Sequence, residues 1–123
     1  MADTAWIYEF FAACEERDGE RAAAFFAEDG YWEAPSLDLR VNGRAALVKA
    51  CGVEASKFSM DEHIEVESVV SDGEVFATQW RSTGTRNSDG GKFNYRGAGV
   101  GRLRDGLITS WSDYFDPAQL GPL

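Results

Sequence analysis

The second half of the chain constrains the fold most strongly, because its apolar residues recur at every second position. Successive side chains of a strand point to opposite faces, so sustained alternation indicates half-buried strands. The segments between the alternating runs contain Asp, Asn and Gly, which accept the positive φ angles of hairpin turns. The expected strands are residues 63–71, 74–86, 92–103 and 107–115.

The first half of the chain has a helical period instead. Asp3 or Thr4 caps a first helix, and Asp18 caps a short second helix that extends through Phe26. A third helix is expected from Asn42 to about residue 58, and short strands at residues 31–34 and 37–41. Helices followed by an antiparallel meander predict an α+β fold, with the helices packed on one face of a curved, mixed or antiparallel sheet in a single domain of residues 1–123.

Charge and composition limit the partners. The net charge of -9 repels phosphates, so neither nucleic acid nor an anionic membrane surface is expected to bind. No apolar run approaches the roughly 18 residues of a membrane span, and a cytoplasmic location is expected. Cys14 and Cys51 lie in helical patterns among apolar residues, which favours reduced core thiols, although the sequence alone does not exclude a bridge. Neither metal-ligand spacing nor a phosphate-binding loop is found, so no cofactor is expected.

An acidic residue occupies an apolar face of the last expected strand. Alternation places Asp113 between Trp111 and Phe115 on one face. A carboxylate there must be paired, solvated by a cavity or protonated, because burial of a lone charge costs several kcal/mol. Buried carboxylates that line clefts are candidates for acid–base chemistry. Asp113 is therefore the candidate general base.

Two further strands predict a row of residues beside Asp113. With the hairpins centred on Asp89 and Asp105, Arg81 lies opposite Gly97, which lies opposite Asp113. A two-residue Asp-Gly loop would shift the second register and break this row unless a bulge restores it. The row is either a structural ion pair or the edge of a ligand pocket. Glycines at positions 97, 99 and 101 leave space on this face, or they bend the sheet.

Tyr31 and Glu33 share one face of the first short strand and complete the candidate catalytic set with Arg81 and Asp113. In the alternative interpretation, Tyr31 is a core aromatic residue and Glu33 an ordinary exposed acid. Arg81 or Tyr31 would stabilise the oxyanion that develops when Asp113 takes a proton. The residues expected to contact the substrate are Gln79, Tyr95, Gly97, Trp111 and Phe115.

The order of elements and three motifs resemble the nuclear transport factor 2-like superfamily, most closely its SnoaL-like polyketide cyclase and limonene epoxide hydrolase-like branch. The resemblance covers about residues 10–120. It implies a cone-shaped α+β barrel with a deep apolar pocket for a small-molecule ligand, and a homodimer formed through the outer face of the sheet. The motifs are Phe26-Ala27-Glu28-Asp29, Gly43-Arg44 and Trp111-Ser112-Asp113-Tyr114-Phe115-Asp116.

The resemblance also implies residue roles, with one departure. In the epoxide hydrolases, the aspartate of the terminal motif activates water together with a tyrosine and an asparagine of the first strand. These positions correspond to Asp113, Tyr31 and, with a substitution, Glu33. An arginine and a second aspartate of those enzymes correspond to Gln79 and Arg81. The acid that protonates the epoxide is therefore missing unless Glu33 replaces it.

Together these observations predict a cofactor-independent enzyme that acts on a small, apolar, oxygenated molecule. The reaction would be cyclisation, isomerisation or epoxide opening. The alternative is a non-catalytic small-molecule-binding or interaction module of the same fold, in which Arg81 and Asp113 only neutralise each other. The missing acid at position 81 favours the alternative, and the open glycine face favours the enzyme.

Overall fold

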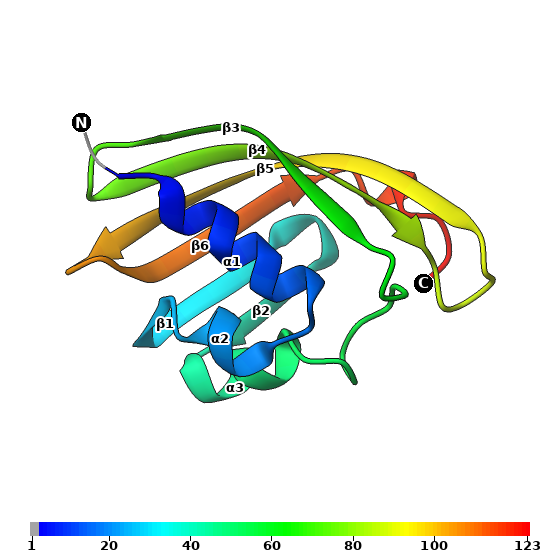
Figure 1. Ribbon diagram of the computed structural model, residues 1–123, viewed down its shortest axis with the longest axis horizontal. Helices are drawn as coiled ribbons and strands as arrows, with labels where there is room; N and C mark the ends of the chain where they lie inside the picture. Colours follow the sequence, from blue (N-terminus) through cyan, green and yellow to red (C-terminus); the bar gives the residue numbers. More distant parts are fainter. Residues whose placement is uncertain (1–2) are drawn as a thin grey trace.

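The structure is a computed structural model that describes residues 3–123. Six strands form one curved sheet in the order β2-β1-β6-β5-β4-β3, and the helices cover one side of it (Figure 1). Strands β1 and β6 are parallel, and the other neighbouring pairs are antiparallel. This arrangement confirms the α+β class and the curved mixed sheet. The helices are α1 (Ala5–Glu15), α2 (Gly19–Ala23) and α3 (Arg44–Ala50), with short 3-10 turns at Pro35–Leu37 and Pro117–Gln119; the strands are β1 (Phe26–Ala34), β2 (Leu39–Asn42), β3 (His63–Ser71), β4 (Val75–Thr85), β5 (Lys92–Arg104) and β6 (Leu107–Phe115).

Two helices are shorter than the sequence predicted. α2 ends at Ala23, and Phe26 begins β1 instead of closing the helix. Phe26 pairs with Ile108 of β6, and both side chains are buried, so pairing within the sheet overrides the local helical spacing. α3 ends at Ala50 rather than near residue 58, and turns fill the segment up to β3.

The core lies between the helices and the sheet, and Trp111 of β6 is at its centre. Its side chain is fully buried. The ring centroid lies 4.8 Å from that of Phe10 and 5.6 Å from that of Phe11, both on α1. On the sheet side, the ring of Phe76 from β4 lies 4.9 Å away. Edge-to-face and tilted aromatic packing of this kind fixes the position of α1 over the sheet.

The β4–β5 hairpin has a register that differs by one residue from the prediction. Trp80 pairs with Gly97, and Arg81 pairs with Arg96. Because a slip of one residue moves every side chain to the opposite face, Arg81 lies on the outer face and Trp80 points inward. The predicted row of Arg81, Gly97 and Asp113 is therefore wrong.

The β5–β6 hairpin uses the two-residue Asp-Gly loop. Asp105 and Gly106 have φ angles of 52° and 79°, as a tight hairpin turn requires. A bulge after Arg102 shifts the register by one residue and so compensates for the shorter loop. As a result, Asp113 pairs with Gly99 and still points inward. The inward orientation predicted for Asp113 is thus confirmed, although its partner is Gly99 rather than Gly97.

The glycines of β5 make room for aromatic rings of the protein and not for a ligand. A Cβ atom at Gly97 would collide with the ring of Trp80. At Gly99 it would lie 2.5 Å from Nε1 of Trp111 and 2.7 Å from Oδ1 of Asp113. The expectation that this face is open was therefore wrong, because side chains of the neighbouring strands fill it.

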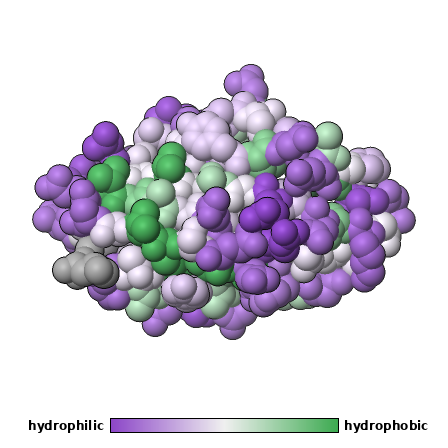
Figure 2. All heavy atoms as spheres, turned by 90° about the horizontal axis from the view of Figure 1, so that it is seen from above, coloured by the Kyte–Doolittle hydropathy of each residue, from purple (hydrophilic) through white to green (hydrophobic). Residues whose placement is uncertain are grey.

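The outer face of the sheet carries a short apolar row. Val70 of β3 pairs with Ala77 of β4, which pairs with Val100 of β5. Val70 is 66% and Val100 is 43% exposed. Figure 2, seen from above the view of Figure 1, shows hydrophobic residues grouped among polar ones. Within residues 3–123, no helix combines the length and the apolar composition that crossing a bilayer requires.

Replacing Gly99 with alanine tests the close packing at the centre of β5. We expect Gly99→Ala to lower the free energy of unfolding by about 1–3 kcal/mol, because the added methyl group meets Trp111 and Asp113. Arg102→Lys, at an exposed position on the outer face of the same strand, should change it by no more than about 0.5 kcal/mol. Urea unfolding of both variants checks this, and equal effects would contradict the packing described here.

Candidate functional site

Three tryptophan side chains hold the carboxylate of Asp113. Oδ1 accepts hydrogen bonds from Nε1 of Trp111 at 2.7 Å and from Nε1 of Trp80 at 3.1 Å. Oδ2 accepts one from Nε1 of Trp32 at 2.8 Å. An indole nitrogen can only donate, so the three rings present a fixed set of donors that suits a carboxylate anion. Three of the chain's four tryptophans serve this one group.

The geometry follows from the order of the strands. Trp111 lies two residues before Asp113 on β6, and Trp32 pairs with Trp111 from the parallel strand β1. Trp80 belongs to β4 and reaches Asp113 across β5, where Gly97 and Gly99 have no side chains that would block the approach. The site therefore depends on the central four strands of the sheet.

Burial raises the pKa of Asp113 above its ordinary value, and the three indole hydrogen bonds lower it only in part. Among residues 3–123, no Lys or Arg side chain forms an ion pair with this carboxylate. No arginine therefore stabilises the anion, and desolvation outweighs the hydrogen bonds. Asp113 is a stronger base than an exposed carboxylate.

Asp113 lies on the wall of a cavity of about 320 Å³ between the helices and the sheet. Asp113 remains partly accessible, and the cavity borders it. Leu37, Lys57 and Leu123 are exposed lining residues and mark the mouth. Most of the wall is aromatic or aliphatic, which suits a small apolar molecule. The aromatic lining residues are Phe10, Phe11, Phe26, Trp32, Phe58, Trp80, Tyr95 and Phe115.

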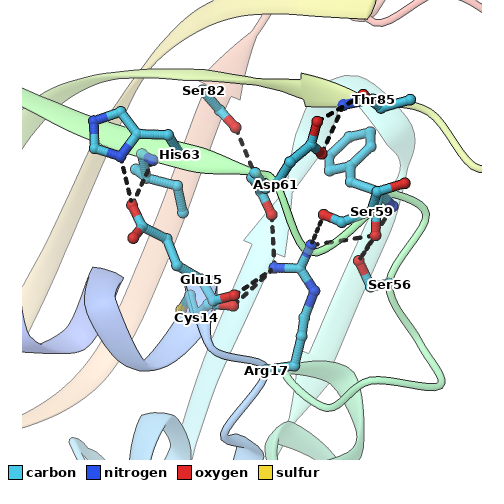
Figure 3. A network of polar contacts seen from close by, with 12 residues as sticks. Cys14, Glu15, Arg17, Ser56, Ser59, Asp61, His63, Ser82 and Thr85 are labelled. Atoms are coloured by element: carbon cyan, nitrogen blue, oxygen red, sulfur yellow. Dashed lines mark hydrogen bonds and ion pairs between the residues drawn. The ribbon is translucent and has the colours of Figure 1, made fainter. Parts of the chain in front are cut away.

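A second acid, Glu62, lines the cavity but is neutralised. Its Oε1 lies 2.8 Å from Nη1 of Arg17, and both side chains are nearly buried. Its Oε2 accepts a hydrogen bond of 2.7 Å from Oγ of Ser82. Arg17 also donates to the carbonyl oxygens of Cys14 at 2.9 Å and Ser59 at 3.0 Å. Figure 3 shows this arginine between the end of α1 and the segment before β3, surrounded by acceptors.

Tyr95 supplies a hydroxyl group on the cavity wall. Burial raises its pKa, and the negative charges of Glu62 and Asp113 raise it further, against a smaller lowering by a hydrogen bond with Ser82. Its phenol therefore remains protonated at neutral pH and can donate a hydrogen bond. Of the residues expected to contact the substrate, Tyr95 and Phe115 line the cavity, whereas Trp111 is not a lining residue and donates a hydrogen bond to Asp113 instead.

Tyr31 and Glu33 lie on the outer face of the sheet, away from the cavity. The guanidinium carbon of Arg40 lies 3.6 Å from the ring centroid of Tyr31. Glu33 accepts a hydrogen bond of 2.7 Å from Ser112. Because Trp32 points inward, both of its neighbours in β1 must point outward. The expectation that Tyr31 and Glu33 share a site with Asp113 is therefore wrong.

Arg81 and Gln79 also lie outside the cavity. Arg81 donates a hydrogen bond of 2.7 Å to Oδ1 of Asn94, and Gln79 accepts one of 2.9 Å from Ser68. Both are on the outer face as a result of the register of the β4–β5 hairpin. Gly97 supports the ring of Trp80 and is not a lining residue. Of the four predicted catalytic residues, only Asp113 reaches the cavity.

Several residues of the site were missed by sequence reasoning. The sequence signal for Trp32 and Trp80 is alternation: in each strand, the face that carries the aromatic residue is the inner face. The pairing of Arg17 with Glu62 has no local signal, because 45 positions separate the two residues. In the part of the chain that the structure describes, no three His, Cys, Asp or Glu side chains are placed to hold a metal ion.

Comparison with known proteins identifies the fold and the family. A family model described as a SnoaL-like domain matches residues 7–111, so its matched range ends two positions before Asp113. No curated protein matches the chain.

Three solved structures illustrate the similarity of the fold. A protein with a ketosteroid isomerase-like fold from Catenulispora acidiphila, in complex with trimethylamine, has a TM-score of 0.85 and 17% identity over 96% of this chain and 90% of that chain. A phenazine biosynthesis-related protein from Pseudomonas aeruginosa has a TM-score of 0.74 and 19% identity, over 92% and 80%. An epoxide hydrolase from M. tuberculosis, similar to limonene epoxide hydrolase, has a TM-score of 0.73 and 19% identity, over 92% and 81%.

The buried carboxylate predicts a dependence of stability on pH. Because the folded state raises the pKa of Asp113, it binds this proton more tightly than the unfolded state does. The contribution of Asp113 to stability is thus greatest below its unfolded pKa and is lost as pH rises through the folded pKa. The unfolding free energy of the wild type minus that of Asp113→Asn should fall between pH 4 and pH 7. Urea unfolding at both pH values measures this, with exposed Asp105→Asn as the control; an unchanged difference would contradict the pKa shift.

Proposed function

We propose that this chain, which belongs to the SnoaL-like domain family and has its nuclear transport factor 2-like fold, is an enzyme that transfers a proton without a cofactor. The observation that carries the proposal is the carboxylate of Asp113 on the wall of an apolar cavity, with no cationic partner among residues 3–123. The substrate is a small, mainly apolar, oxygenated molecule. Cyclisation, isomerisation and epoxide opening are the reactions that such a base could serve.

Asp113 is the proton acceptor in this proposal. Its burial strengthens it as a base, and the three indole donors fix its orientation, so it does not have to reorganise during the reaction. With one bond to Trp32, Oδ2 keeps a lone pair that can take a proton from water or from a carbon next to a carbonyl. The same oxygen can return the proton to another position.

Tyr95 takes the role that the sequence gave to Tyr31 or Arg81. Its protonated phenol lines the cavity, and the negative charge of Asp113 contributes to its raised pKa. A hydroxyl donor of this kind stabilises negative charge that develops on a substrate oxygen. Arg17 does not suit the role, because Glu62 and backbone carbonyl groups already occupy its guanidinium.

We also infer that two copies of the chain associate through the outer face of the sheet. The row of Val70, Ala77 and Val100, in which both valines are exposed, supports this inference, since apolar side chains on an open sheet face favour burial against a partner. The residues of the cavity lie on the opposite side, so association of this kind leaves the site accessible.

Replacing the base tests the proposal directly. A panel of ketones and terpene epoxides is screened for protein-dependent deuterium exchange at the carbon next to the carbonyl and for diol formation. Asp113→Asn should reduce any turnover by about 100-fold or more, and Tyr95→Phe by a smaller factor. Tyr31→Phe, on the outer face, should retain full turnover. Activity that persists in a folded Asp113→Asn variant would exclude Asp113 as the base.

The second candidate function is the binding of a small organic cation without catalysis. An unpaired carboxylate among aromatic rings matches the needs of an ammonium group, because ring faces and the anion both attract it. The similar structure from Catenulispora acidiphila contains trimethylamine, which supports this alternative.

Two molecules of similar shape and different charge distinguish the candidates. For the binding module, tetramethylammonium should bind at least about tenfold more tightly than neutral tert-butanol, as measured by tryptophan fluorescence. Asp113→Asn should remove this preference while leaving the affinity for tert-butanol unchanged. Equal affinities for the two molecules in the wild type would exclude a cation site.

A further inference from the structure

The two cysteines of the chain meet in the cavity wall. Cys14 lies in the last turn of α1, and Cys51 directly follows α3. Both are free thiols and both line the cavity. The chain segments that follow the two helices pack together, since a Cβ atom at Gly19 would lie 3.4 Å from the backbone nitrogen of Gly52. Hydrogen bonding between the two thiols is the largest influence on the pKa of each. The proposed proton transfer uses neither of them. Two thiols in contact at the surface of one cavity form a site with its own chemistry.

Their surroundings make the two sulfur atoms unequal. The hydrogen bond to Cys51 and burial raise the pKa of Cys14, and the nearby charges of Glu62 and Asp113 raise it further. The same hydrogen bond lowers the pKa of Cys51, because the Cys14 thiol donates to the Cys51 thiolate. A thiolate is the nucleophilic form of cysteine, so Cys51 is the sulfur that reacts first.

We propose that Cys14 and Cys51 form a redox-active dithiol site that hydroperoxides oxidise to an intramolecular disulfide. The thiolate of Cys51 attacks the terminal peroxide oxygen, the O–O bond breaks, and the leaving oxygen takes a proton to become water or an alcohol. The sulfur of Cys14 then attacks the resulting sulfenic acid of Cys51, and the S–O bond breaks with loss of water. Two thiols and one hydroperoxide thus give one disulfide, one water and one further water or alcohol, and the two sulfurs supply the two electrons.

The cavity gives the oxidant its path to this pair. Both cysteines are partly accessible, and both border the cavity. The disulfide would connect the end of α1 to the end of α3 across this wall. A thiol reductant would reverse it by exchange. Because neither step uses Asp113, the inference does not depend on the proposed proton transfer.

Hydrogen peroxide treatment of the reduced protein in the presence of dimedone, followed by mass spectrometry, tests the inference. The wild type should lose two hydrogen atoms and yield a peptide in which Cys14 is linked to Cys51, and dithiothreitol should reverse both changes. In Cys14→Ser, the sulfenic acid of Cys51 has no partner and should be trapped by dimedone. In the matched variant Cys51→Ser, oxidation of Cys14 should be at least about tenfold slower.

Wild-type protein unfolded in urea and treated with the same peroxide is the positive control, because both of its cysteines are accessible and should be oxidised. Retention of both thiols in the folded protein under that condition would overturn the inference, as would disulfides formed only between chains. Cys14→Ala and Cys51→Ala replace any serine variant that does not fold. Turnover by reduced Cys14→Ser with Asp113 intact reports separately on the proposed proton transfer.

Discussion

The hydrogen bonds from three indole groups to one carboxylate are the interaction on which the site depends. They connect β1, β4 and β6, which are far apart in sequence, at a single pair of oxygen atoms. A buried anion is costly when its donors are incomplete, so each tryptophan constrains the position of the others. No Lys or Arg side chain among residues 3–123 pairs with this carboxylate, so it is available to a ligand.

Charge is distributed unequally over the two walls of the cavity. On one wall, Arg17 and Glu62 neutralise each other and join α1 to the chain before β3. On the other wall, Asp113 has no cationic partner among residues 3–123 and lies among aromatic rings. In a buried ion pair, the attraction between the two charges offsets the cost of removing them from water. A buried carboxylate without a cation lacks this compensation and lowers the stability of the fold. A destabilising carboxylate on the wall of a cavity is typical of a functional site.

Much of the fold could be predicted from the sequence, because the spacing of apolar residues indicates which segments form strands and helices. Alternation defined the four long strands and the inward direction of Asp113, and the resemblance to the SnoaL-like branch is confirmed by the family match. Register was the weak point. The register predicted for the β4–β5 hairpin was wrong by one residue, so Arg81 was expected to point inward where the structure has Trp80. In β1, likewise, Tyr31 was expected on the inner face, which carries Trp32 instead. Contacts such as Arg17 with Glu62 depend on tertiary packing and leave no pattern in the sequence.

The parallel pairing of β1 with β6 has a consequence for how the protein folds during synthesis. Of the six described strands, β1 with Trp32 is synthesised first, and β6 with Trp111 and Asp113 is synthesised last. Closing so long a stretch of chain is slow, because the entropy of the intervening segment is lost before the contacts form. The carboxylate and its donors thus cannot come together before β6 has been synthesised, and a nascent chain that lacks β6 has no site.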